Sequence, residues 1–258
     1  MRQTPLQNRV TPFGDIIATP ERGAFTGNRG CIHRRDRKEL TGQRWTTTRW
    51  ITCLLEFQGR RRELMAPGLW TELFFLDEPT ALAAGHRPCA FCRRADYNRF
   101  MAAWSAGNPA LVGAGRLRAE TVDAVLHRER VGPAKQKVTF EAHLNDLPDA
   151  TMVVRRAAPI TAWLLRSGQL LRWSSGGYVE TTTANPGERV AVLTPRSTVN
   201  ALASGYQASS EFPNDPESVP RPSPQRKAHL PKEARASRRP HPSPRPTHES
   251  VPRPGRSP

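Results

Sequence analysis

Two cysteines separated by two residues are the sharpest chemical signal in this sequence. Cys89 and Cys92 lie in the stretch GHRPCAFCRR, residues 85–94. Two thiolates at this spacing can bind one metal ion, and zinc binds thiolates at about 2.3 Å in a tetrahedral shell. Pro88 restricts the backbone before the first cysteine, and the neighbouring arginines favour thiolate over thiol. The motif therefore predicts half of a zinc site.

The other ligands of such a site must come from elsewhere in the chain. Cys31 and His33 lie in a polar stretch and are the pair that we expect to complete the site, with a bend at Ile32 aiming both at one ion. Cys53 lies inside the apolar run WITCLLEF, which predicts that it is a small buried apolar side chain. His86 is a further candidate ligand.

Two other interpretations of the CxxC motif stay open. The cysteines could be buried thiols without a metal, or a redox pair. The flanking sequence lacks the strand-to-helix context of a thioredoxin-like motif, which favours metal binding over redox chemistry.

The segment around this motif resembles a known zinc domain. Residues 72–94, ELFFLDEPTALAAGHRPCAFCRR, are similar to the second half of the zinc domain of the Ada family of alkyl-DNA repair proteins. The matching residues are Phe74 and Phe75, the alanine-rich stretch 81–84, Arg87, Pro88, Cys89 and Cys92. The resemblance implies a zinc-binding fold that works close to DNA.

The resemblance stops at the second half of that domain. The family takes its first ligand pair, which includes the methyl-accepting cysteine, from an upstream CxxxC motif, and this chain contains no CxxxC. The nearest counterpart is Cys31 with His33, so the resemblance does not extend to methyl transfer. The whole chain also resembles a bacterial family with the segments GNRG, TELFFLDE, GHRPC and LTPxSTV, which implies no particular activity.

The charge of the chain favours a polyanionic partner. The formal net charge is +16 over 258 residues, and Lys and Arg bind nucleic acids by neutralising phosphates. Basic residues cluster at 29–38, at 60–62 and at 93–94. Trp45 and Trp50 lie between the first two clusters, a combination typical of phosphate contacts with base stacking. We predict that nucleic acid, DNA rather than RNA, contacts Arg34, Arg35, Arg60, Arg61, Arg93 and Arg94.

The pattern of apolar residues predicts an α+β fold, with short strands in mixed sheets and inserted helices around the zinc knuckle. Strands are expected at residues 50–57 and 71–76, with 62–65 returning beside the first. Asp77 is expected to cap a short helix that Gly85 ends. Further helices are expected at 95–105, 117–130 and 198–203, and short strands at 137–144, 151–155, 163–165, 170–173 and 189–194, whereas residues 1–48 are expected to be mostly loop.

The chain divides by composition into three parts. Residues 1–110 are expected to form the Ada-like zinc region and residues 111–205 an α+β region packed on it. Residues 206–258 contain 13 of the 25 prolines and few apolar residues, which predicts a disordered tail. The sequence has no apolar run long enough for a transmembrane helix and no apolar segment near its start, so we expect a cytoplasmic protein without membrane contact.

These observations favour a zinc-binding protein that contacts nucleic acid, with a structural metal closed by four protein ligands. One alternative is a metal-dependent enzyme that processes or repairs nucleic acid, with three protein ligands and an open fourth position. The number of ligands separates the two hypotheses. A third is a small-molecule binder built on the C-terminal strands. The sequence leaves open whether the protein is an enzyme.

Overall fold

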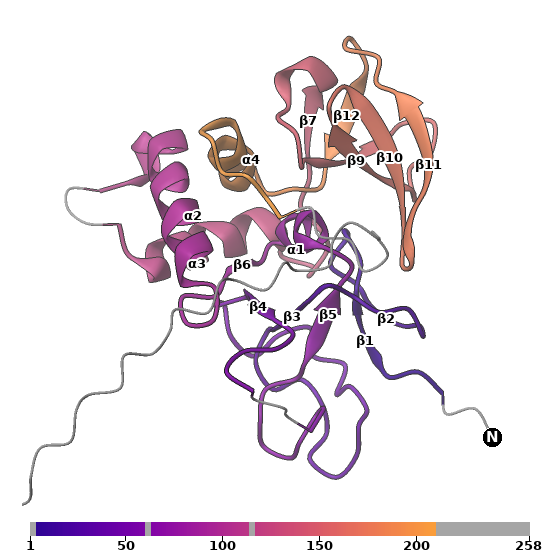
Figure 1. The fold of residues 1–258 in the computed structure, drawn as a ribbon, viewed down its shortest axis with the longest axis vertical. Helices are drawn as coiled ribbons and strands as arrows, with labels where there is room; N and C mark the ends of the chain where they lie inside the picture. The colour runs from indigo at the N-terminus through magenta and orange to yellow at the C-terminus, as the bar shows by residue number, and fades with distance from the viewer. Residues whose placement is uncertain (1–3, 60–62, 114–116, 210–258) are drawn as a thin grey trace, which may run out of the picture. The chain divides into compact units, whose positions relative to one another are not determined.

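The computed structural model describes residues 4–59, 63–113 and 117–209, which belong to one compact unit (Figure 1). Within these ranges the fold is α+β, as the sequence predicts, with two six-stranded sheets and four α-helices. No helix in the described part of the chain is both long and apolar enough to cross a membrane.

The N-terminal sheet carries the part of the chain that holds the cysteine motif. Its strands lie in the order β2-β1-β5-β3-β4-β6. They are β1 (Gln7–Val10), β2 (Ile16–Ala18), β3 (Phe25–Asn28), β4 (Ile51–Leu54), β5 (Leu73–Phe75) and β6 (Arg87–Pro88). The parallel pairing of β4 with the two-residue strand β6 forms one edge of the sheet.

The second sheet follows the first along the chain and lies in the order β11-β10-β9-β8-β12-β7. Its strands are β7 (Phe140–His143), β8 (Met152–Arg155), β9 (Ala162–Arg166), β10 (Gln169–Ser174), β11 (Gly177–Thr183) and β12 (Arg189–Val192). All of its pairings are antiparallel, and a bulge in the pairing of β10 with β11 lies near Trp173.

The described residues form four α-helices. They are α1 (Glu78–Ala83), α2 (Arg94–Gly107), α3 (Ala119–Arg130) and α4 (Arg196–Ala203), with short 3-10 turns at Pro109–Leu111 and Leu144–Asp146. Helices α2, α3 and α4 share a core around Phe100, Trp104 and Leu126.

Helix α1 connects the two sheets. Ala81 packs into the core of the N-terminal sheet, while Ala83 packs against Met152 and Leu164 of the second sheet. Its N-terminus is capped by Asp77, which accepts a hydrogen bond from the Thr80 N–H at 2.8 Å, as the sequence predicts.

Gly85 ends α1 with a φ of +86°, and a side chain there would collide with Arg130. The turn therefore delivers residues 86–92 directly to the edge of the N-terminal sheet.

Most of residues 4–48 lie outside helices and strands, as predicted, although the short strands β1, β2 and β3 lie among them. Two other secondary-structure expectations were wrong. Strand β11 was missed. Residues 63–65 form no strand beside β4, because β3 and β6 take its two edges. The predicted division at residue 110 stays a prediction.

The chain is folded beyond the boundary at which the sequence predicts the tail to begin. Tyr206 is 4% exposed and its ring packs edge-on against Phe100 at 5.2 Å. The Tyr206 hydroxyl and the Ser209 N–H both donate hydrogen bonds to the Glu78 carboxylate. The predicted boundary is therefore at least four residues too early. The remainder of the predicted tail, residues 210–258, lies outside the described residues.

Candidate metal centre

Three cysteine sulfurs lie together at the edge of the N-terminal sheet. The sulfurs of Cys53, Cys89 and Cys92 all lie within 4.8 Å of one another, and this is the one such group of potential metal ligands among the described residues. A tetrahedral zinc ion with sulfur ligands at about 2.3 Å requires sulfur separations of about 3.8 Å. The triangle is therefore compatible with three ligands to one ion.

Strand pairing explains why Cys53 belongs to this group. In the parallel pairing of β4 with β6, Ile51 lies opposite Arg87 and Thr52 opposite Pro88. The Cys89 N–H continues the ladder with a 2.9 Å hydrogen bond to the Thr52 carbonyl. Cys53 therefore follows β4 to the level of Cys89, and the expectation that it is only a small apolar side chain was wrong.

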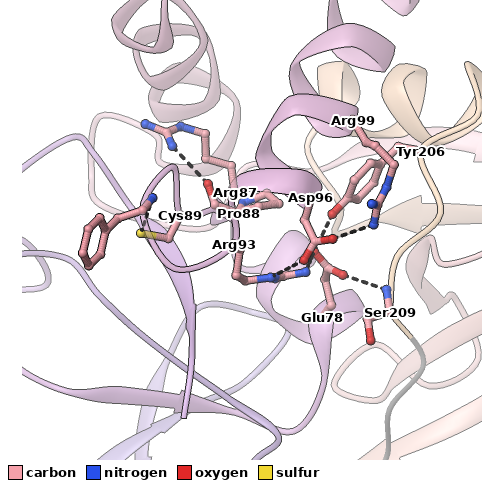
Figure 2. A network of polar contacts seen from close by, with 10 residues as sticks. Glu78, Arg87, Pro88, Cys89, Arg93, Asp96, Arg99, Tyr206 and Ser209 are labelled. Carbon is pink, nitrogen blue, oxygen red and sulfur yellow. Dashed lines mark hydrogen bonds and ion pairs between the residues drawn. The ribbon is translucent and has the colours of Figure 1, made fainter. Parts of the chain in front are cut away.

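Backbone N–H groups surround the sulfurs. The Cys89 sulfur accepts a hydrogen bond from the Phe91 N–H at 3.4 Å (Figure 2). The pKa of Cys89 is lowered well below its usual range because its sulfur accepts hydrogen bonds from the Cys53 and Cys92 thiols and from backbone N–H groups. The thiol of Cys53, which donates to Cys89, has a raised pKa. Cys89 is therefore the first of the three to be a thiolate, the form that binds a metal.

The three cysteines line a cavity of about 280 Å³. Alternation along β4 directs Ile51 and Cys53 toward it, and Glu72 reaches it from the residue before β5. Aromatic rings of Phe57 and Phe91, with centroids 5.2 Å apart, form part of its wall. The sulfur group thus adjoins a space that can admit a small ligand.

Glu72 is the carboxylate of this cavity. Its side chain is buried, and one oxygen, Oε2, accepts a 2.7 Å hydrogen bond from the Met65 N–H. The other oxygen, Oε1, is buried without a hydrogen-bond partner in the structure. A buried carboxylate oxygen without a partner is costly, so it indicates a role that a bound ligand or water completes.

The structure does not bring Cys31 or His33 into the sulfur group. Both ring nitrogens of His33 are engaged: Nδ1 lies 2.7 Å from the Thr71 hydroxyl and Nε2 3.3 Å from the Ala66 carbonyl. His33 is 3% exposed, and its two contacts hold the loop in which it lies against Ala66 and Thr71. The Cys31 sulfur lies 3.9 Å from the His33 carbonyl oxygen.

Of the arginines predicted to contact phosphate, Arg93 is not available. Its side chain is 2% exposed, and it pairs with Glu78 and Asp96 at 2.8 Å each (Figure 2). The guanidinium instead joins α1 to α2, and it lies over the ring of Phe25 at 4.6 Å. Arg34, Arg35 and Arg94 are exposed, whereas Arg60 and Arg61 lie outside the described residues.

Comparisons with known proteins leave the site to be interpreted from its own chemistry. No family model matches the chain, and neither a curated protein nor a solved structure matches it.

Proposed function

We propose that Cys53, Cys89 and Cys92 bind one zinc ion, and that the chain is a metal-dependent enzyme whose fourth coordination position opens into the adjoining cavity. The observation that carries the proposal is the ligand count. Three sulfurs converge, and among the described residues the space beside them is a cavity that holds no fourth ligand. A closed structural site would use four protein ligands, whereas a catalytic site keeps one position for water or substrate.

The donor set favours zinc over other cations. Thiolates select zinc, copper(I) and iron–sulfur clusters over magnesium and calcium, which prefer oxygen ligands. The Phe91 N–H that donates to the Cys89 sulfur would orient this ligand and reduce the charge on its thiolate. When bound in such a site, zinc supplies a Lewis acid that lowers the pKa of a coordinated water.

Glu72 supports a hydrolytic role for the site. A carboxylate beside an open metal position can accept a proton from the attacking water and return it to the leaving group. The Met65 N–H holds one carboxylate oxygen, which leaves Oε1 for that task. The proposed reaction class is therefore metal-assisted hydrolysis, with Glu72 as general base.

Nucleic acid is the partner that the charge of the chain favours, with DNA ahead of RNA. Arg34, Arg35 and Arg94 are exposed, and Arg94 lies two residues after Cys92. Exposed arginines such as these can neutralise the phosphates of a nucleic-acid backbone through charge alone. A protein with a structural zinc that only binds nucleic acid is the second candidate function, supported by the same exposed arginines.

Metal analysis of purified variants tests the proposal. Wild-type protein purified under reducing conditions is expected to hold one zinc per chain, and Cys53→Ser to lose it. Cys31→Ser is the matched control and is expected to keep its zinc. Loss of zinc from Cys31→Ser but not from Cys53→Ser would overturn the assignment.

Cobalt substitution separates the two candidate functions. An open site is expected to change its visible absorption when azide enters the fourth position, whereas a closed four-ligand site does not respond. A cobalt protein that is indifferent to azide would move the function to the second candidate.

A further inference from the structure

A second polar group lies on the other side of β4 from the cysteines. Ile51 and Cys53 line the cavity, whereas Trp50, directly before β4, is buried away from it. The guanidinium carbons of Arg29 and Arg130 lie 4.0 and 3.9 Å from the centroid of the Trp50 ring. Both arginines are almost completely buried, at 0% and 2% exposure. Two cations thus share one aromatic ring inside the protein.

Two N–H donors in this group have no acceptor among the described residues, Nη2 of Arg29 and Nε of Arg130. His86 Nε2 accepts a 3.4 Å hydrogen bond from Arg29 Nε, so in a neutral ring the proton lies on Nδ1. His86 is fully buried, and its ring centroid lies 5.2 Å from that of Trp50. Buried donors without acceptors are rare in folded proteins, because each one carries a desolvation cost.

A third cation adds to the unbalanced charge. The half-buried Lys137 donates a hydrogen bond to the Ala83 carbonyl. Its pKa is lowered to about 7, first by burial and then by the charges of Arg29 and Arg130. The pKa of Arg130 is lowered to about 9, chiefly by burial. These three side chains repel one another inside the fold.

The nearby carboxylates are already paired. Asp123 forms a two-point ion pair with Arg87, with distances of 2.8 and 2.7 Å. Asp15 pairs with Arg44 at 2.9 Å, and its side chain is 59% exposed. In the described part of the chain, no carboxylate forms an ion pair with Arg29, Arg130 or Lys137, although the charges of Asp123 and Asp15 act on Arg130 and Lys137. Arg29 and Arg130 donate to backbone carbonyls, which carry no net charge. Two buried guanidinium groups without an ion pair therefore point to a counter-ion from outside the chain.

We propose that Arg29, Arg130, Lys137 and His86 form a binding site for a phosphate group. Phosphate supplies two negative charges and several acceptor oxygens, which match multiple cations and unpartnered donors better than a monovalent ion does. The partly exposed Arg44, Trp45 and His127 form the edge of the site, with the Trp45 ring 5.4 Å from that of His127. Phosphate esters present this chemistry as a free mononucleotide or as a polynucleotide backbone.

Phosphate titration of the full chain tests the site without reference to the cysteines. Inorganic phosphate is expected to raise the melting temperature of wild-type protein more than sodium chloride does at equal ionic strength. This increase is expected to saturate with phosphate concentration. Calorimetry is expected to show one phosphate bound per chain. Lys137→Met is expected to weaken phosphate binding by about tenfold or more, because it removes a charge-assisted hydrogen bond.

Lys135→Met is the matched control, since Lys135 is exposed in the same loop and is expected to keep wild-type phosphate affinity. Without phosphate, Lys137→Met is expected to melt no lower than wild type, because it removes a repelled cation. If that variant fails to fold, Arg44→Met, at the edge of the site, is expected to weaken phosphate binding in its place.

Equal effects of phosphate and chloride on wild type would overturn the proposal, as would equal phosphate affinity in the Lys137→Met and Lys135→Met variants. Competition identifies the source of the phosphate. Displacement of phosphate by a nucleoside monophosphate supports a mononucleotide, and displacement only by a short single-stranded oligonucleotide supports a polynucleotide backbone. Neither measurement involves zinc. The phosphate-site proposal can therefore be refuted while the metal-site proposal stands, and the metal-site proposal can be refuted while the phosphate site stands.

Discussion

The Cys53 sulfur lies within 4.8 Å of the Cys89 sulfur because Thr52 and Pro88 are paired across β4 and β6. Cys53 therefore lies in a strand, and Cys89, directly after β6, is hydrogen-bonded to that strand. The third, Cys92, follows within the same short turn that precedes α2. A metal at this place would bind a preformed triangle, which limits the ordering that binding requires.

The buried carboxylate of Glu78 is expected to be essential for stability. Glu78 receives hydrogen bonds from Arg93, Tyr206 and the Ser209 N–H. Glu78→Gln removes the charge that balances buried Arg93, although Asp96 still pairs with it. We expect a loss of about 2 to 4 kcal/mol in the free energy of unfolding, measured in urea. Glu120→Gln, at an exposed position of α3, is the control and is expected to change little. An equal effect of the two substitutions would contradict this account of the network.

Truncation is expected to locate the end of the folded region. A chain ending at Gly205 lacks the buried Tyr206 ring and its hydrogen bond to Glu78. We expect it to lose about 3 kcal/mol of stability relative to the full chain. A chain ending at Ser209 keeps those contacts and is expected to melt with the full protein. Equal melting temperatures for the two truncations would place the boundary at Gly205 after all.

The lowered pKa of Lys137 predicts a pH dependence of stability. Its pKa is about 7 in the folded protein, against a usual value of 10.5. Below pH 7 the folded and the unfolded protein both hold the Lys137 proton, so the free-energy cost of burying the ammonium charge is fully present. Between pH 7 and 10.5 the folded protein releases the proton first, so the cost falls as the pH rises.

The comparison of Lys137→Met with wild type isolates this contribution to stability. The other groups that interact with the Lys137 ammonium are present in both proteins: Arg29, Arg130, Arg44, Asp15 and His86. In chloride buffer, the stability that Lys137→Met gains over wild type is expected to shrink from pH 7 to pH 10. Lys135→Met is expected to show no such trend. A gain that grows with pH would contradict the assignment.

Local signals in the sequence predicted the elements that carry the site. Asp77 as the N-cap and Gly85 as the residue that ends the helix determine where α1 begins and ends. Both depend only on residues close in sequence, and the structure confirms both. The spacing of Cys89 and Cys92 likewise brings their sulfurs together through a single turn. These features depend on residues a few positions apart, which is the range over which sequence patterns are informative.

The third sulfur could not be found in the same way. Cys53 joins the pair only through the register of β4 against β6, a contact between distant parts of the chain. Its apolar surroundings in WITCLLEF are equally typical of a buried strand with no chemical role. The burial of Arg29 and Arg93 was missed for the same reason, since an arginine that is paired or stacked inside the fold has no local signature.

X-ray absorption at the zinc edge of the metal-loaded protein counts the sulfur ligands of the metal. We expect three sulfurs at about 2.3 Å and one lighter atom, which correspond to Cys53, Cys89, Cys92 and an exchangeable ligand. Four sulfurs would mean that Cys31 closes the site, and two sulfurs with nitrogen ligands would mean that histidine replaces Cys53. Either result, or a protein that binds no zinc, would contradict the open three-cysteine centre.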